Sequence, residues 1–304
     1  MTKLSDGTEF AAAIDDVTTV QAPKGKLAFS YSDKHQSTFR RSLIRGIEIL
    51  SGSKTFERLY ETWKVMPRGL DDTIFASAIA TLGVKIEFVS GNADAIPATG
   101  AVLVVANHPF GIIDGLLIGH LASLGRSDVK LMVHSLLAQP PGVKDSLLPV
   151  DFSGTSLSRR ISASTRKRAV DWLHDGHVLV IFPAGGISTS PKPWSRRAAD
   201  PAWHPFVARL AARPGVKTVP IFVHGQNSRL FQVLSHVSYP LRIAMIFHET
   251  KRRLNQPVQV AIGAVLECAG MDRDQIVEHL RTVTLSLGGA DPKAEYRFPK
   301  WFRF

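Results

Sequence analysis

The stretch that decides the fold is Ala101-Val-Leu-Val-Val-Ala-Asn-His-Pro-Phe-Gly-Ile-Ile-Asp-Gly115, in which an apolar run leads directly into a polar turn. An unbroken apolar run rich in valine is typical of a parallel strand that is covered on both faces. A second such run, residues 177–182, leads into Pro183-Ala-Gly-Gly-Ile-Ser-Thr189. If both runs are parallel strands of one sheet, both turns leave its carboxyl edge, where open α/β sheets form their ligand crevices.

Outward from these two runs, short apolar runs alternate with helical patterns. Further strands are expected at residues 84–89, 129–134, 217–223 and 258–262, and helices at 116–124, 156–174, 205–212 and 272–287. Before residue 84 the apolar residues recur at helical spacing, which predicts helices at 38–50, 56–63 and 74–82. This order predicts an α/β fold with a mainly parallel twisted sheet flanked by helices, preceded by an N-terminal helical region.

The same pattern divides the chain into four parts. We expect a flexible N-terminal tail at residues 1–37, amphipathic helices at 38–83, the α/β domain at 84–270, and a C-terminal helix with an aromatic and basic tail at 271–304. Residues 1–21 carry several acids and no long apolar core, so they resemble neither a secretory signal nor a basic transit peptide. Because Pro97 and Pro109 interrupt the apolar segment 95–125, we expect no membrane-spanning helix there.

Composition limits the class of partner but does not select one. The 304 residues include 37 Lys and Arg against 26 Asp and Glu, a net charge of +11, which suggests an anionic partner such as nucleic acid, a membrane surface or an acidic carrier protein. A hydrophobic content of 44% is that of a globular chain with a packed core. The single cysteine, Cys268, excludes an internal disulfide and a multi-cysteine zinc site.

A histidine and an aspartate follow the first run within one short turn. An aspartate can hold the tautomer of an imidazole while the free ring nitrogen takes a proton from a substrate. In this interpretation His108 is the base, Asp114 orients it, and Gly111 lets the turn bend so that the two side chains meet. A structural interpretation stays open: His108 is a satisfied loop histidine, and Asp114 caps a helix that starts near Gly115.

The second turn offers groups that bind anions. The adjacent glycines Gly185 and Gly186 expose backbone N–H groups, and Ser188 and Thr189 add hydroxyls, so that together they can cradle an anion. The alternative is a plain turn. A position at the same sheet edge as His108 favours the functional interpretation.

Together these motifs resemble the glycerophospholipid acyltransferase superfamily. Its lysophosphatidate acyltransferase-like members carry Asn-His, four residues and Asp as their first motif. The chain has Asn107 and His108, with five residues before Asp114. Its Phe182-Pro-Ala-Gly-Gly186 resembles the family's Phe-Pro-Glu-Gly-Thr block, and the resemblance covers about residues 84–262.

Other blocks and two departures refine this resemblance. Leu148-Pro-Val-Asp151 and Val219-Pro-Ile221 resemble the intermediate and the later family motifs. Ala184 stands where the family has Glu, and no Arg follows Gly186, where many members use one to bind the acceptor phosphate. These features and the stretch 225–231 are closer to the haemolysin-type branch, which includes acyltransferase domains of ornithine-lipid synthesis.

The resemblance implies an O-acyltransferase of membrane lipid synthesis. In it His108 deprotonates the hydroxyl of a lyso-ornithine-type or lysophosphatidate acceptor, which attacks an acyl-carrier protein (acyl-ACP) or coenzyme A (acyl-CoA) thioester, and Asp114 orients His108. It requires no metal ion or redox cofactor. The positions that it places at the substrate are Asn107, Gly111, Pro183, Gly185, Gly186, Ser188 and Thr189. The sequence does not identify the group that stabilises the oxyanion; backbone donors near Gly111 or in the turn 185–188 are the candidates.

A lipid substrate implies contact with a bilayer. We expect a cytoplasmic protein that is peripheral on the inner face of the cell membrane and binds an anionic surface. The basic helix at 38–50 and the aromatic tail 296–304 are the candidate anchors; the alternative is that both pack on the fold. The cations of residues 159–168 are either a solvated helix face or a dock for the donor.

Two other classes of protein compete with this reading. A serine-type lipid hydrolase also uses an α/β sheet and a His–Asp pair, but the chain has no Gly-x-Ser-x-Gly motif for the nucleophile. A non-catalytic nucleic-acid-binding protein fits the charge, but no zinc-finger or RNP-type motif is present. We therefore expect an enzyme with a lipid acceptor and no nucleic-acid partner.

Overall fold

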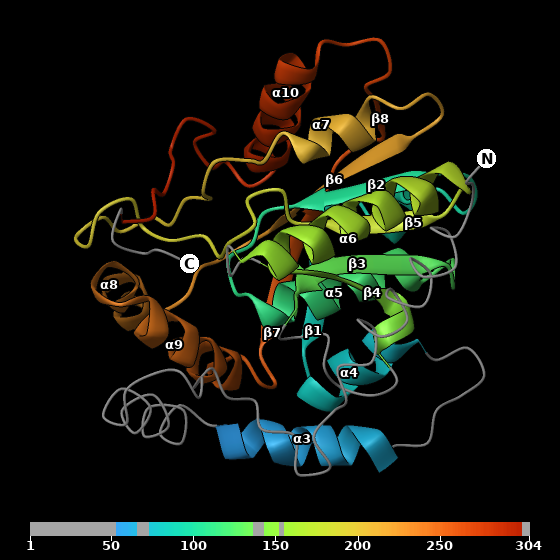
Figure 1. The fold of residues 1–304 in the computed structure, drawn as a ribbon. Helices are drawn as coiled ribbons and strands as arrows, with labels where there is room; N and C mark the ends of the chain where they lie inside the picture. The colour runs from blue at the N-terminus through green and yellow to red at the C-terminus, as the bar shows by residue number, and fades with distance from the viewer. Residues whose placement is uncertain (1–52, 66–72, 136–142, 152–154, 300–304) are drawn as a thin grey trace, which may run out of the picture.

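The computed structural model describes residues 53–65, 73–135, 143–151 and 155–299. The predicted helix at 38–50 and the last five residues of the aromatic tail lie outside these ranges. The elements, drawn in Figure 1, are α3 (Ser53–Val65), α4 (Ile74–Leu82), β1 (Lys85–Ser90), η1 (Ala93–Ala95), β2 (Val102–Ala106), α5 (Ile112–Ser123), β3 (Val129–His134), η3 (Lys144–Ser146), β4 (Leu147–Val150), α6 (Ser156–His174), β5 (Val178–Ile181), α7 (Phe206–Ala211), β6 (Lys217–Val223), α8 (Arg229–Val237), α9 (Tyr239–Arg252), β7 (Pro257–Ile262), β8 (Leu266–Glu267) and α10 (Arg273–Ser286).

The sheet is mixed and mostly parallel, as the sequence predicts. Its strand order is β1-β7-β6-β2-β5-β3-β4, with β8 paired to β6. Strand β2 lies between two parallel neighbours, so that Val104 faces Val180 on β5 and Val219 on β6. Only the pairs β6–β7 and β6–β8 are antiparallel in the described part of the chain. All five residues of β2 are buried, which explains its valine-rich sequence.

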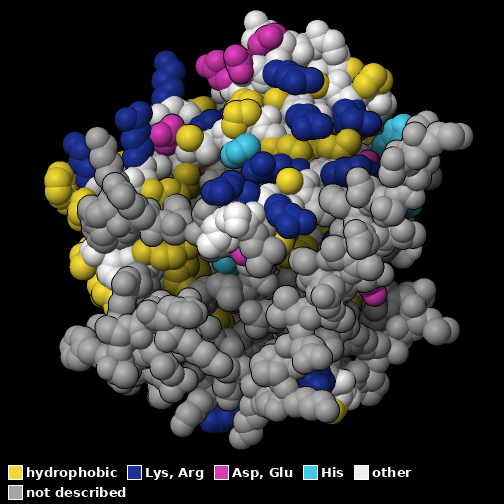
Figure 2. Space-filling model, viewed as in Figure 1, with side chains coloured by type: hydrophobic (Ala, Val, Ile, Leu, Met, Phe, Trp, Pro, Cys, Tyr) yellow, Lys and Arg dark blue, Asp and Glu magenta, His cyan; other side chains and the backbone are white. Residues whose placement is uncertain are grey.

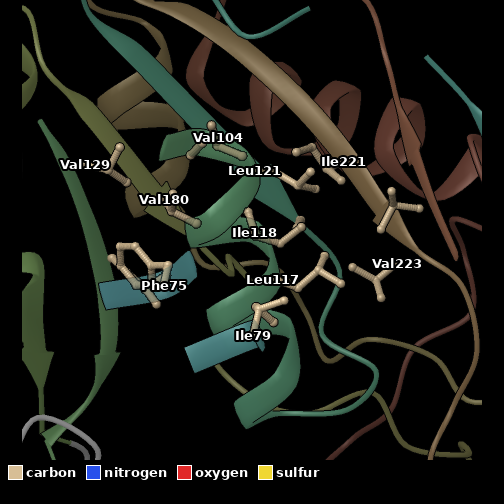
Figure 3. Packing of buried hydrophobic residues seen from close by; sticks show 14 of the residues in the cluster. Phe75, Ile79, Val104, Leu117, Ile118, Leu121, Val129, Val180, Ile221 and Val223 are labelled. Atoms are coloured by element: carbon tan, nitrogen blue, oxygen red, sulfur yellow. The ribbon is translucent and has the colours of Figure 1, made fainter. Parts of the chain in front are cut away.

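Helices cover both faces of the sheet (Figure 1). Because side chains alternate along a strand, β2 contributes to two separate cores. Val102 and Val104 pack with α4 and α5, whereas Leu103 and Val105 pack with α6, α7 and α10. Figure 3 shows the first of these cores, with three side chains of α5 directed at the sheet: Leu117, Ile118 and Leu121.

Helix α4 belongs to the main core, although it precedes the expected start of the α/β domain at residue 84. Phe75 and Ile79 are buried in the same cluster as Val104 (Figure 3). The Thr73 hydroxyl caps the helix by accepting a hydrogen bond from the Ala76 amide at 3.2 Å. The helix ends at Gly83, which is in the left-handed conformation with φ 63°.

The structure differs from the predicted elements in two ways. Helix α5 begins at Ile112 instead of near residue 116, so Asp114 lies inside its first turn. Helices α8 and α9 and strands β4 and β8 were not predicted.

In the described ranges, no helix combines the length and the hydrophobicity that crossing a bilayer requires.

Candidate active site

The structure brings His108 and Asp114 together at the carboxyl end of β2. Nδ1 of His108 lies 3.0 Å from Oδ2 of Asp114, although five residues separate the pair. The Asp114 side chain is fully buried, whereas 18% of the His108 side chain is exposed. The polar turn thus joins a buried carboxylate to a histidine that solvent can reach.

The turn 107–111 is folded around the Asp114 carboxylate. Oδ2 accepts hydrogen bonds from the amide of Phe110 at 2.7 Å and from that of Gly111 at 2.8 Å. Gly111 has φ 90°, and a Cβ there would lie 2.8 Å from Cδ1 of Ile187. Asp114 therefore caps the start of α5 and faces His108 at once, so both interpretations of this residue describe real contacts.

The imidazole of His108 is held between the carboxylate and an aromatic ring. Its ring centroid lies 4.2 Å from that of Phe182, and the two planes are stacked at 25°. Because Nδ1 faces Asp114, Nε2 on the opposite side of the ring is the nitrogen that can take a proton from a bound molecule. Phe182 ends the second apolar run and directly precedes the second turn, so this ring contact joins the two segments.

Asn107 fastens the first turn to the neighbouring strand. Its amide nitrogen donates to the carbonyl of Val223 at 2.9 Å, and its amide oxygen accepts from the amide of Val223 at 2.7 Å. The side chain is buried. The structure thus gives this predicted substrate residue a structural contact that fixes the end of β2 against β6.

The second predicted turn lies beside the first. The amide of Ser188 donates to the carbonyl of His108 at 2.7 Å. Pro183 is buried, and its carbonyl accepts from the amide of His204 at 2.8 Å. Gly185 is exposed, has φ 62° and donates its amide to Phe182 at 2.9 Å. The two turns therefore form one site, as expected from parallel strands.

The hydroxyls of this turn are engaged inside the protein. Ser188 donates its hydroxyl hydrogen bond to the carboxylate of Asp200. The Thr189 hydroxyl donates to the carbonyl of Ile187 at 3.0 Å and accepts from Arg242 at 2.6 Å. Both side chains are buried, so neither offers the predicted anion contact in this arrangement. Among the described residues, the amides of Gly186 and Ile187 have no hydrogen-bond acceptor.

Asp200 is a site residue that the sequence analysis missed. It is fully buried, and it accepts hydrogen bonds from Ser188, from Nε1 of Trp203 at 3.1 Å and from the amide of His108 at 3.5 Å. Burial raises the pKa of this carboxyl group, while the hydrogen bonds from Ser188 and Trp203 oppose that rise. A sequence signal exists, because Asp200 is the only acid between residues 176 and 248.

Arg242 on α9 is a second missed residue. Its guanidinium is buried and donates to the carbonyl of Ile187 at 2.7 Å, in addition to its bond to Thr189. Burial lowers its pKa to about 10, so it stays charged at neutral pH. The rings of Phe231, Tyr296 and Phe298 surround it at 5.1 to 5.4 Å.

The described part of the C-terminal tail covers this turn. Tyr296 is 1% exposed, and its amide donates to the carbonyl of Asp200 at 3.1 Å. A Cβ at Gly186 would lie 2.9 Å from the ring of Phe298. The packing interpretation of the tail therefore holds for these two aromatic residues, and they are not free to anchor a membrane.

The stretch 225–231 supports the first turn from its other side. A Cβ at Gly225 would lie 2.6 Å from the ring of Phe110. The Arg253 guanidinium lies 4.1 Å from the centroid of that ring and donates to the carbonyl of Gln226 at 3.3 Å. Burial lowers the pKa of Arg253, while Glu249 and Asp114 favour its charged form.

This geometry defines an α/β protein with a His–Asp pair at the carboxyl edge of its central strand, and comparison with known proteins gives its family. Residues 39–251 match the family model described as acyltransferase. The chain belongs to this acyltransferase family. It is an acyltransferase of the lysolipid type, and the resemblance to the glycerophospholipid acyltransferase superfamily is confirmed.

Two relatives found by sequence carry the same name, and one solved structure is similar in fold. The chain is 25% identical over 254 residues to lyso-glycine lipid O-acyltransferase of Bacteroides thetaiotaomicron, covering 80% of this chain and 83% of the relative. It is 26% identical over 159 residues to the enzyme of the same name in Phocaeicola vulgatus, covering 50% and 53%. The 1-acyl-sn-glycerophosphate acyltransferase PlsC of Thermotoga maritima aligns with a TM-score of 0.45 and 17% identity, covering 82% of this chain and 87% of PlsC.

Proposed function

We propose that the protein transfers a fatty acyl group from an acyl thioester to the hydroxyl of an amino-acid lysolipid, with His108 as the general base. The observation that carries this proposal is the 3.0 Å approach of Nδ1 of His108 to the buried Asp114 carboxylate. That contact leaves Nε2 free for a substrate proton and stabilises the imidazolium that results.

The reaction follows from that arrangement. Nε2 takes the proton of the acceptor hydroxyl as its oxygen attacks the thioester carbonyl carbon. The tetrahedral intermediate collapses with cleavage of the C–S bond, and the imidazolium returns its proton to the departing thiolate. The products are an ester and a free thiol. Hydrogen bonds to Asp114 from two backbone amides keep its carboxylate in place through both proton transfers.

The oxyanion of the intermediate needs hydrogen-bond donors. The amides of Phe110 and Gly111 are bonded to Asp114, and those of Gly185 and Ser188 to backbone carbonyls. We assign the oxyanion to the amides of Gly186 and Ile187, which have no acceptor in the described part of the chain. Their place next to Ser188, whose amide binds the His108 carbonyl, supports this assignment.

An amino-acid lysolipid suits the second turn better than lysophosphatidate does. The first cation after Gly186 in the sequence is Lys192, and the hydroxyls of Ser188 and Thr189 are bound internally. The turn thus lacks the side chains that would bind a phosphate dianion. The names of the two relatives, both lyso-glycine lipid O-acyltransferases, support the same choice. We therefore propose lyso-glycine lipid as an acceptor beside the lyso-ornithine type.

The donor, acyl-ACP or acyl-CoA, carries negative charge on its carrier. Five cationic residues of α6 are exposed, and basic side chains gather on the face that Figure 2 shows; the five are Arg159, Arg160, Arg166, Lys167 and Arg168. Helix α6 follows β4, which is part of the same sheet. We propose that the donor docks at this helix and that the enzyme works as a peripheral protein on the inner face of the cell membrane.

Acyl transfer to a panel of acceptors tests this function. Purified protein receives a labelled acyl group on ACP or on CoA, together with lyso-glycine lipid, lyso-ornithine lipid or lysophosphatidate in identical detergent micelles. We expect kcat/KM for an amino-acid lysolipid to exceed that for lysophosphatidate by about tenfold or more, a difference of about 1.4 kcal/mol. The reverse order contradicts the proposed acceptor, and no transfer with any pair contradicts the reaction.

A further inference from the structure

A surface beside the site combines exposed apolar side chains with cations. We propose that this surface, the outer face of α8 together with the loop 190–200, docks the enzyme onto an anionic bilayer. This inference rests on the proposed lysolipid acceptor and names the part of the molecule that meets the lipid. We call it the docking face.

Helix α8 is apolar on its outer side, whereas two of its three buried residues are polar. Phe231, Gln232 and Ser235 are buried against the protein. Leu230, Val233 and Val237 are 53%, 39% and 57% exposed. Their spacing of three and four residues places them in one stripe, where a water-facing helix would carry polar residues. A helix with an apolar outer stripe suits an interface with lipid.

The loop 190–200 places a tryptophan at the start of this stripe. Trp194 is 73% exposed. Arg229, the first residue of α8, donates hydrogen bonds to the carbonyls of Pro193, at 2.9 Å, and Ser195, which flank Trp194 in the chain. Trp194 and the α8 stripe therefore form one fixed surface. Tryptophan is enriched at membrane interfaces because its ring is apolar and its N–H is polar.

The charge of the docking face fits an anionic surface. Between residues 176 and 248 the only acid is Asp200, and it is buried. The exposed charged residues of the loop and of the α8 start are all cations: Lys192, Arg196, Arg197 and Arg229. An acid-free basic rim around apolar side chains favours anionic lipid over a neutral surface. In Figure 2, basic and apolar side chains both lie along the left edge, where Figure 1 places α8 and this loop.

The docking face is continuous with the site. The loop 190–200 follows the second turn directly. Asp200 at the end of the loop accepts hydrogen bonds from the hydroxyl of Ser188 and from the amide of His108. Gln226 fastens the middle of the loop by accepting from the amide of Ala198 at 2.8 Å and donating to the carbonyl of Arg196 at 2.8 Å. A bilayer bound here lies next to the carboxyl edge of the sheet, so a lysolipid need not leave the interface completely to reach His108.

Sedimentation with vesicles tests the binding. The full-length protein is compared with the triple variant Trp194→Ser/Leu230→Ser/Val237→Ser and with a control, Phe88→Ser/Leu124→Ser, which changes exposed apolar residues elsewhere. The vesicles are phosphatidylcholine alone or phosphatidylcholine with one quarter phosphatidylglycerol. We expect the wild type and the control to bind the anionic vesicles, more weakly at high salt, and the triple variant to bind at least about tenfold less tightly. Equal binding by the triple variant, or equal binding of the wild type to neutral vesicles, overturns the inference.

Tryptophan fluorescence locates the contact. Brominated phosphatidylglycerol in the vesicle quenches a tryptophan that enters the interface, and Trp194→Phe keeps an aromatic ring in place while removing the fluorophore. We expect quenching in the wild type and its loss in Trp194→Phe, with vesicle binding retained. Quenching that persists in Trp194→Phe places another tryptophan in the bilayer and contradicts the assigned face.

Activity separates this inference from the proposed function. The triple variant should keep wild-type turnover on a short-chain acceptor that is monomeric in water, and lose most of its turnover on the same head group in vesicles. If the wild type acylates neither form, the proposed function fails, while the binding assays still decide the docking face. If the triple variant retains both vesicle binding and vesicle turnover, the docking face is wrong and the function stands.

Discussion

Asp114 contacts three groups with one carboxylate oxygen. Oδ2 accepts from the amides of Phe110 and Gly111, which shapes the turn, and it faces Nδ1 of His108. An asparagine in its place can keep one oxygen as an acceptor but carries no charge to stabilise imidazolium. The residue thus joins the fold of the turn to the proton transfer.

We therefore expect Asp114→Asn to lower kcat by about 100-fold, the lower end of what general base assistance supplies. KM for the acceptor should change much less, because Asp114 is buried and does not reach the substrate. Steady-state kinetics measure both constants. Asp94→Asn, an exposed site in η1, is the matched control and should behave as wild type. A wild-type kcat in folded Asp114→Asn would contradict the role of this carboxylate.

Asp200 gives a pH signature. Burial raises its pKa above the ordinary value of 3.8, so the folded state holds the proton more strongly than the unfolded state. The free energy of unfolding therefore falls as the pH rises from about 4 through the pKa of the folded state. Above that pKa, the contribution of Asp200 to the free energy of unfolding no longer changes with pH. Asp200→Asn lacks this titration. Urea unfolding between pH 4 and 8 should show the wild type losing stability relative to Asp200→Asn as the pH rises; parallel curves would contradict the raised pKa.

The sequence predicts the local parts of the site and misses the distant ones. His108, Gly111 and Asp114 lie within one turn, so their meeting follows from short-range geometry. Asp200 and Arg242 contact groups of the site that lie 12 to 92 residues away in the chain, which no local pattern encodes. Local sequence also could not show that the hydroxyls of Ser188 and Thr189 are engaged inside the protein. Their partners, Asp200 and Arg242, come from other parts of the chain, so the sequence analysis assigned these hydroxyls to an anion.

At the scale of elements, α5 links the site to the core. Leu117 is fully buried between the sheet and α4, and α5 begins within the turn that carries His108 (Figure 3). Leu117→Ala should lower the free energy of unfolding by about 2–5 kcal/mol, through lost transfer energy and the cavity that remains. Leu124→Ala, at a position 57% exposed at the end of the same helix, should change it by less than about 0.5 kcal/mol. Equal losses in urea unfolding would contradict this packing.

Two strands were predicted at their observed bounds, whereas two short strands and two helices were missed. The predicted ranges 129–134 and 217–223 are those of β3 and β6. Strand β4 contains Pro149, and the sheet tolerates this proline because β4 is an edge strand. Helix α9 has a proline in its first turn, where a helix accepts one although the sequence suggests a break. Helix α8 is amphipathic but only nine residues long, and its apolar stripe is exposed instead of buried.

Across the whole molecule, Arg242 joins three distant segments. Arg242 lies on α9. Its guanidinium donates hydrogen bonds to the second turn and contacts the rings of Tyr296 and Phe298 in the C-terminal tail. Net charge and composition carry no information about such a contact, which exists only in the complete fold. The buried charge is balanced by hydrogen bonds to Thr189 and Ile187 and by the aromatic faces around it.

Arg242→Met should therefore lower the free energy of unfolding by about 1.5–3 kcal/mol for each of the two lost hydrogen bonds. Part of this loss is offset because the variant no longer buries a charge. Turnover should fall as well, because the turn that carries Gly186 and Ile187 loses its support. Arg242→Lys should restore little, since one ammonium cannot reproduce the planar fork of donors. Urea unfolding and kcat measure the two effects. Wild-type stability together with wild-type turnover in Arg242→Met would contradict the joining role.

The central claim is that His108 takes the proton of a lysolipid hydroxyl, and the most direct measurement is transfer of a labelled acyl group by folded His108→Ala. The wild type and His279→Ala, which changes an exposed histidine on α10, serve as references, and circular dichroism verifies that each variant is folded. The account predicts transfer by His108→Ala about 100- to 10,000-fold below that of both references. Transfer at the wild-type rate by folded His108→Ala would contradict it.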